Sequence, residues 1–283
     1  MLVSVVIPNH NGEQFIAECI ESVLSQTYTE IEVIVVDDHS TDRSVLEISK
    51  YAGKVALLNS SQKGACFARN LGIQSAKGLL IALLDSDDVW VPTKLEKQVE
   101  LMESKSLGLV YCNGEEFGPN VADRKIHHGK FQGDCFKDFE LNPGVSIVEL
   151  GCSTALIRRD LFKEVGLFDT NFQGAAEDWD MFRRICKVTK IDFVDEVLIQ
   201  YRRHQNSISA RDLSDFVKGN EMAVRKLISA DETMSLLRSR LCWAKLQQMI
   251  LKTSLKQMRP ILLFNSIVNL VVGPRTRKRL SAS

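Results

Sequence analysis

The strongest constraint on the fold of this 283-residue chain is an apolar run that ends in acidic residues. Residues 79–84 read Leu-Leu-Ile-Ala-Leu-Leu, and Asp85, Asp87 and Asp88 follow directly. A run this short, preceded by Gly78, predicts a strand that is buried on both faces. In open α/β sheets, ligands bind beyond the carboxyl ends of the strands, so these carboxylates lie where a ligand is expected.

The three carboxylates also predict a cation. Like charges this close together repel one another, so they require a cation or an unusual proton balance. Hard oxygen ligands at this spacing suit Mg²⁺ or Mn²⁺, with the remaining coordination positions left to substrate phosphates. For these few residues taken alone, a solvated acidic turn is the alternative interpretation.

Strand-like and helix-like segments alternate along the chain. The predicted strands are residues 2–7, 31–36, 55–58, 79–84, 109–112, 155–157 and 194–201. The predicted helices lie around residues 15–24, 45–48, 68–73, 93–104, 160–165 and 181–187, and residues 113–145 look irregular. This alternation predicts an α/β fold with right-handed crossovers and a mostly parallel central sheet flanked by helices. A second strand end is also acidic, at Asp37 and Asp38, which favours a ligand site over chance.

Charge is unevenly distributed although the chain has 36 basic and 36 acidic residues. Residues 211–283 hold 14 Lys and Arg against 5 Asp and Glu, a net charge of +9, which leaves 22 against 31, or −9, for residues 1–210. An acidic body argues against nucleic acid as the main ligand. The seven cysteines are scattered without a C-x-x-C pair, which favours buried thiols in a reducing compartment. No signal peptide or span-length apolar run is visible, so we expect a cytoplasmic protein.

Several motifs in order resemble the family 2 glycosyltransferases, which have the GT-A fold. The resemblance covers about residues 3–209. Its pieces are Val3–Pro8, Val36–Asp42, Lys63-Gly64, Ala68–Gly72, Asp85–Asp88, Gly166–Asp169, Glu177-Asp178 and Tyr201–Ser209. Two small departures are His10, where the family more often has an aromatic residue such as Tyr, and His39, where Gly or Asn is commoner.

The resemblance implies a divalent cation, Mn²⁺ or Mg²⁺, at the acidic strand end. Asp87 is the implied direct ligand, and Asp85 contacts the metal through water or holds the ribose. His204 is implied to complete the metal site from the far end of the domain, with Arg202, Arg203 and Ser207 around it. A surface-loop histidine is the alternative for His204 considered alone.

The resemblance also implies a binding site for a nucleotide-sugar donor. The implied residues are Pro8, Asn9, Asp38, Lys63, Arg69, Asp85 and Ser86. Asp38 is expected to accept a hydrogen bond from a uracil imide, and Pro8 to supply a backbone contact. A plain surface arginine is the alternative for Arg69.

A carboxylate is needed to take the proton of the attacking acceptor hydroxyl. By resemblance this general base is Asp178, with Glu177 as a supporting or orienting group. Acidic residues are also common at helix N-termini because of the helix dipole, so the pair alone leaves that alternative open. Trp179 either stacks on an acceptor sugar or packs in the core. Displacement assisted by one base implies inversion at the anomeric carbon.

We therefore expect a catalytic GT-A domain at residues 1–210 and a basic helical region at 211–283. Residues 213–258 read as amphipathic helices, followed by an apolar run at 261–272 and a basic cluster at 275–279. This region either lies on an anionic membrane surface, at the inner face of the membrane, or packs on the catalytic domain. The expected acceptor is a glycan or a lipid-linked glycan, as in bacterial polysaccharide biosynthesis. The rival interpretations are a sugar nucleotidyltransferase and a non-catalytic nucleotide- or carbohydrate-binding protein on the same fold.

Overall fold

The computed structural model describes residues 1–119, 121, 123–137, 146–172, 175–204, 213–230, 235–256, 266 and 269. The strands are β1 (Val3–Asn9), β2 (Ile31–Asp37), β3 (Val55–Asn59), β4 (Leu80–Leu83), β5 (Val89–Trp90), β6 (Leu109–Phe117), β7 (Ile126–His127), β8 (Leu156–Arg158) and β9 (Ile191–Arg202). The helices are α1 (Ile16–Leu24), α2 (Ser44–Ser49), α3 (Ala65–Ser75), α4 (Lys94–Lys105), α6 (Leu161–Val165), α7 (Glu177–Cys186), α8 (Leu213–Ala230), α9 (Leu236–Lys256) and the 3₁₀ helix η1 (Gly151–Thr154).

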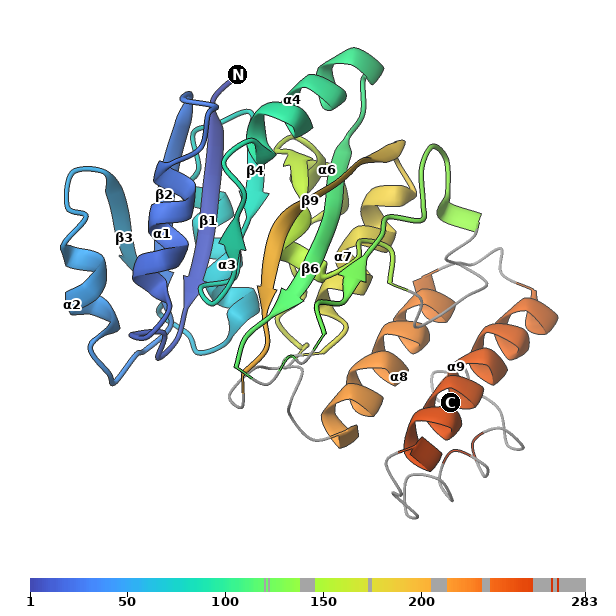
Figure 1. Ribbon diagram of the computed structural model, residues 1–283. Helices are drawn as coiled ribbons and strands as arrows, with labels where there is room; N and C mark the ends of the chain where they lie inside the picture. Colours follow the sequence, from blue (N-terminus) through green and yellow to red (C-terminus); the bar gives the residue numbers. More distant parts are fainter. Residues whose placement is uncertain are drawn as a thin grey trace, which may run out of the picture.

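One central sheet organises the molecule (Figure 1). Its strand order is β3-β2-β1-β4-β8-β6-β9-β5, with β7 paired to β6. The strands β3, β2, β1 and β4 are parallel, β8 runs antiparallel between β4 and β6, and β9 is parallel to β6. The predicted α/β fold with a mostly parallel sheet is confirmed, because most strands run in one direction.

The central strands are buried on both faces, as the apolar run at 79–84 predicted. Ile81 and Leu83 of β4 point into one core cluster, whereas Leu80 and Ala82 point into the other. Every residue of β1 and β4 is buried. This burial fixes the register of the strands, and with it the positions of the polar residues that follow them.

The C-terminal helices α8 and α9 share a core cluster with the sheet and α7. Ala223, Val224 and Leu227 of α8 belong to the same buried cluster as Phe182 of α7 and Tyr111 of β6. Figure 1 shows α8 and α9 side by side, with α8 next to α7. A helical region after residue 213 was expected, and α8 and α9 are its described part.

Parts of the C-terminal prediction lie outside the described residues. These are the basic cluster at 275–279 and the apolar run at 261–272, of which only residues 266 and 269 are described. None of the helices in the described ranges combines the length and the hydropathy needed to span a bilayer.

Candidate active site

Polar residues from three parallel strands meet at one edge of the sheet. Register places Asn9, the last residue of β1, opposite Asp37 of β2, and Val6 opposite Leu83 of β4. The residues after β4 therefore emerge beside the end of β1. A side chain placed on Gly12 would lie 2.4 Å from Asn9 Oδ1 and 3.3 Å from Ser86 Oγ, so this corner is closely packed.

The predicted base-binding residues form a hydrogen-bonded turn at this edge. Pro8 lies in β1 opposite Val36, and the Asn9 amide nitrogen donates to Asp37 Oδ1 (3.0 Å) and to Ser40 Oγ (3.2 Å). Asp38 Oδ2 accepts from the backbone N–H of Gly64 at 2.9 Å, which brings the loop before α3 to the end of β2. Lys63 is exposed beside it. Their nucleotide-binding role stays a prediction.

Each of the three carboxylates after β4 has a different partner. Asp85 Oδ1 accepts from Arg69 Nη2 at 2.7 Å, and Asp87 Oδ2 lies 2.9 Å from His204 Nε2. Asp88 is fully buried, and its Oδ1 accepts from the backbone N–H of Arg202 at 3.0 Å. The repulsion expected from the sequence is therefore reduced by partners from α3, from the end of β9 and from His204, two residues beyond that end.

Burial is the largest influence on the pKa of Asp87 and of Asp88. Burial and the negative charge of Asp85 raise the pKa of Asp87, while the hydrogen bond and charge of His204 oppose that rise. Burial, followed by the charges of Asp87 and Asp85, raises the pKa of Asp88 well above its ordinary value. A cation at this site would favour the ionised forms.

The ligand types at Asp87 and His204 fit a divalent cation as a partial coordination set. A carboxylate and an imidazole suit Mn²⁺, and carboxylates with water and phosphate oxygens suit Mg²⁺. Within the described residues, no group of three or more His, Cys, Asp or Glu side chains is arranged to hold a metal. Asp87 and His204 would supply two ligands of such a cation, and oxygens of water and of substrate phosphates are suited to the other positions.

Arg69 is buried and paired with two carboxylates. It is only 3% exposed, so it is not a surface arginine. Besides Asp85 it contacts Glu177, with Nη1 3.3 Å from Oε1. The guanidinium thus bridges a carboxylate after β4 and a carboxylate at the start of α7. Direct contact of Arg69 with a nucleotide stays a prediction.

Glu177 and Asp178 lie in the first turn of α7. The predicted helix began at Met181, which is wrong, because a left-handed backbone at Ala176 (φ 66°) lets α7 begin at Glu177. Burial, together with the negative charge of Glu177, raises the pKa of Asp178 to about 6. A carboxylate with this pKa is suited to accept a proton near neutral pH.

The segment around η1 contributes contacts that the sequence did not indicate. The backbone N–H of Asp85 donates to Ser153 Oγ at 3.0 Å, and a side chain placed on Gly151 would lie 3.0 Å from Asp178 Oδ2. The residues of η1 have small side chains and no hydrophobic periodicity, so their sequence did not indicate this role. Ser207, which belongs to the motif around His204, lies outside the described residues.

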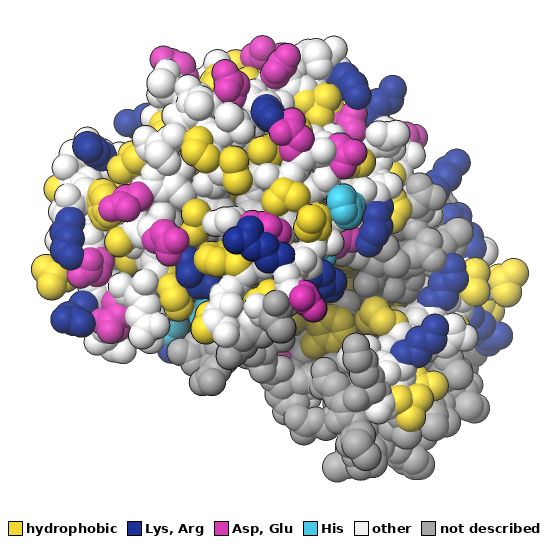
Figure 2. Space-filling view, viewed as in Figure 1, with side chains coloured by type: hydrophobic (Ala, Val, Ile, Leu, Met, Phe, Trp, Pro, Cys, Tyr) yellow, Lys and Arg dark blue, Asp and Glu magenta, His cyan; other side chains and the backbone are white. Residues whose placement is uncertain are grey.

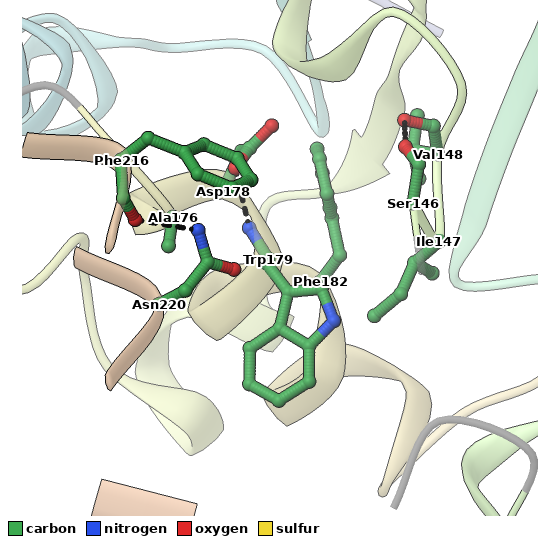
Figure 3. Close-up of a pocket in the computed structure, with 9 residues that line it drawn as sticks. All are labelled: Ser146, Ile147, Val148, Ala176, Asp178, Trp179, Phe182, Phe216 and Asn220. Carbon is green, nitrogen blue, oxygen red and sulfur yellow. Dashed lines mark hydrogen bonds between the residues drawn. The ribbon is translucent and has the colours of Figure 1, made fainter. Parts of the chain in front are cut away.

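A pocket of about 140 Å³ opens beside Asp178 (Figure 3). Its walls come from the segment before η1, from α7 with the residue before it, and from α8. The lining residues are Ser146, Ile147, Val148, Ala176, Asp178, Trp179, Phe182, Phe216 and Asn220. The candidate base therefore faces a cavity that α8 helps to form.

Comparison with known proteins identifies the family. The model described as "Glycosyl transferase family 2" matches residues 4–166, and that described as "Glycosyltransferase like family 2" matches residues 120–232. The chain belongs to glycosyltransferase family 2. The sugar nucleotidyltransferase interpretation is thereby set aside.

This glycosyltransferase is similar to several bacterial proteins. It is 33% identical to the UDP-Glc:alpha-D-GlcNAc-diphosphoundecaprenol beta-1,3-glucosyltransferase WfgD of Escherichia coli, over 74% of this chain and 80% of WfgD. It is 30% identical to glycosyltransferase GlyG of Streptococcus pneumoniae, over 84% of this chain and 85% of GlyG. It is 34% identical to an uncharacterized glycosyltransferase of Rickettsia typhi, over 72% of this chain but 64% of that protein.

A solved structure supports the GT-A fold. The crystal structure of S. aureus TarS in complex with UDP-GlcNAc matches 96% of this chain and 81% of that chain, with a TM-score of 0.71 and 18% identity. The similarity at this identity concerns the fold. It agrees with the sheet and flanking helices described above.

Replacement of Arg69 by Met should destabilise the protein strongly. The change removes the guanidinium that pairs with both Asp85 and Glu177. Breaking a buried ion pair by removing one partner lowers the free energy of unfolding by about 3–5 kcal/mol. Urea unfolding measures the change. The control is Arg43→Met, which removes an exposed pair with Glu13 and should cost less than about 1 kcal/mol. Equal effects of the two substitutions would contradict the bridging role.

Proposed function

We propose that this glycosyltransferase moves a sugar from a UDP-sugar to a hydroxyl of a lipid-linked glycan, with inversion and with help from Mn²⁺ or Mg²⁺. The observation that carries the proposal is the bridge through Arg69, which joins the acidic end of β4 to the carboxylates that begin α7. The names of WfgD and WfaP of Escherichia coli, which specify UDP-Glc and a diphosphoundecaprenol acceptor, support these substrate classes.

The chemistry assigns one role to each group. Asp178 takes the proton of the acceptor hydroxyl as its oxygen bonds to the anomeric carbon. The bond from that carbon to the diphosphate oxygen breaks on the opposite face, so the configuration inverts. Asp87 and His204 would hold the divalent cation, with Asp85 contributing through water, and a bound cation would offset the negative charge on the diphosphate.

The remaining residues bind and orient. Asp38 would accept from the uracil imide beside Pro8 and Asn9, with Lys63 and Ser86 at the same edge. Arg69 holds Glu177 through its charge, and Glu177 in turn raises the pKa of the neighbouring Asp178. A non-catalytic binding protein would not need a carboxylate whose pKa is raised in this way. The arrangement therefore favours catalysis.

Replacement of Asp178 by Asn should abolish transfer but keep donor binding. Loss of a general base typically lowers kcat by about 10²–10⁴-fold. Transfer from radiolabelled UDP-glucose to a GlcNAc-diphosphate-lipid, and UDP binding with Mn²⁺, provide the two measurements. Asp160→Asn, at an exposed position before α6, is the matched control and should be fully active. Wild-type turnover by the Asp178 variant would contradict the assignment.

The rate of transfer should fall in acid with a midpoint near pH 6. Below the raised pKa of Asp178, which is about 6, the base is protonated, so kcat/KM drops about tenfold per pH unit. Glu177→Gln removes the neighbouring negative charge and should move the midpoint to lower pH. A pH profile of both proteins checks this, and a midpoint that stays in place would argue against Asp178 as the titrating base.

We also propose that the start of α9 contacts an anionic membrane surface. Exposed leucines and arginines lie close together there: Leu236, Leu237, Arg238, Arg240 and Leu241. Figure 2 shows hydrophobic and basic side chains together along the right-hand edge of the molecule. Apolar side chains beside basic ones are typical of helices that lie at a membrane interface.

Replacement of Leu236 and Leu237 by Ser should weaken binding to phosphatidylglycerol vesicles by roughly tenfold or more. The reason is that serine side chains gain little free energy when they enter the apolar part of the membrane, whereas leucine side chains gain much more. Vesicle co-sedimentation measures the bound fraction. Leu255→Ser, at an exposed leucine near the other end of α9, is the control and should bind normally. Unchanged binding by the double variant would contradict this contact.

A further inference from the structure

The pocket beside Asp178 includes residues from the C-terminal region. Phe216 and Asn220 of α8 form one wall, opposite Ile147 and Val148, with Trp179 of α7 between them (Figure 3). Its volume of about 140 Å³ lies below the roughly 300–1,000 Å³ of pockets that hold whole drug-sized ligands. A space of this size suits a single sugar ring and not a nucleotide.

Two residues of α8 fix this helix against α7 and the residues before α7. Lys226 Nζ lies 2.8 Å from Asp169 Oδ2 and 3.0 Å from Asp180 Oδ2, and Asp180 is fully buried. Gly219 allows close approach, because a side chain there would lie 2.5 Å from the backbone oxygen of Ala175. The wall that α8 contributes is therefore held in place before any ligand binds.

Trp179 carries an unused donor at this pocket. The residue is only 7% exposed, and its indole N–H has no hydrogen-bond acceptor among the described residues. Buried donors are nearly always paired in proteins, and an unpaired one is unfavourable. An oxygen of a bound ligand would satisfy it.

Phe216 and Asn220 have the complementary features of a sugar-binding wall. Phe216 is 40% exposed although it is a large aromatic residue, and its ring lies at the pocket. Asn220 Nδ2 donates to the backbone oxygen of Phe216 at 2.8 Å, and Figure 3 shows the carboxamide oxygen on the side of Trp179. An aromatic face, a carboxamide oxygen and an indole N–H together suit a ring with an apolar face and hydroxyl substituents.

We propose that α8 completes the acceptor site, with Phe216 packing on the acceptor sugar ring and the Trp179 N–H donating to one of its oxygens. These residues would select the acceptor and place its hydroxyl at Asp178. The inference rests on the proposed transferase function and adds specificity-determining residues to it. It also gives the C-terminal region a part in recognition.

Kinetics with a soluble acceptor test this inference. The probe is GlcNAc-diphosphate on a short alkyl chain, with UDP-glucose as donor. Trp179→Phe, which keeps a buried aromatic ring but lacks the N–H, and Phe216→Ala should each raise the acceptor KM about tenfold, a difference of 1.4 kcal/mol in binding. The donor KM should change less than about twofold, because neither residue belongs to the proposed donor site. Phe216→Tyr should restore the acceptor KM, and Leu255→Ala serves as the control.

A second measurement separates this inference from the proposed function. Saturation-transfer NMR with methyl α-N-acetylglucosaminide, in the presence of UDP and Mn²⁺, detects sugar binding without any transfer. We expect a signal in the wild type that is lost in Trp179→Phe and Phe216→Ala. A signal that both variants retain, an acceptor KM that neither changes, or an equal rise of donor and acceptor KM would overturn the inference. Failure of UDP itself to bind would instead count against the proposed function.

Discussion

A single buried guanidinium connects the two halves of the site. Arg69 lies on α3 and contacts Asp85 after β4 and Glu177 at the start of α7. Buried charges are stable only when they are paired, so the positions of Asp85 and Glu177 both depend on the Arg69 guanidinium. The spacing between the acidic turn after β4 and the start of α7 follows from this bridge.

The acidic cluster after β4 is stable for a related reason. His204 and the backbone N–H of Arg202 supply partners to Asp87 and Asp88 from the end of β9, more than a hundred residues away in the sequence. The bond from Arg202 Nε to the backbone oxygen of Asp87, at 2.8 Å, holds the same turn. The pairing of β9 with β6 and β5 therefore brings His204 to Asp87.

The elements with strong local signals were predictable from the sequence. The run at 79–84 is buried on both faces, and the acidic ends of β2 and β4 reach one edge of the sheet because parallel strands share a direction. His39 has a left-handed backbone (φ 58°), which explains why Gly or Asn is commoner there in the family. Elements set by distant partners were not predictable: β6 continues through Asn113 to Phe117 because it pairs there with β9 and β7. The pocket wall from α8 likewise depends on packing that no local pattern encodes.

We propose above all that the end of β4 binds a nucleotide diphosphate together with a divalent cation. Isothermal titration of UDP into the wild type and Asp87→Asn, each with Mn²⁺ and with EDTA, tests it most directly. We expect the wild type to bind UDP with Mn²⁺, and UDP binding to be at least about tenfold weaker with EDTA or in the variant. UDP binding of equal strength in all four titrations would contradict it.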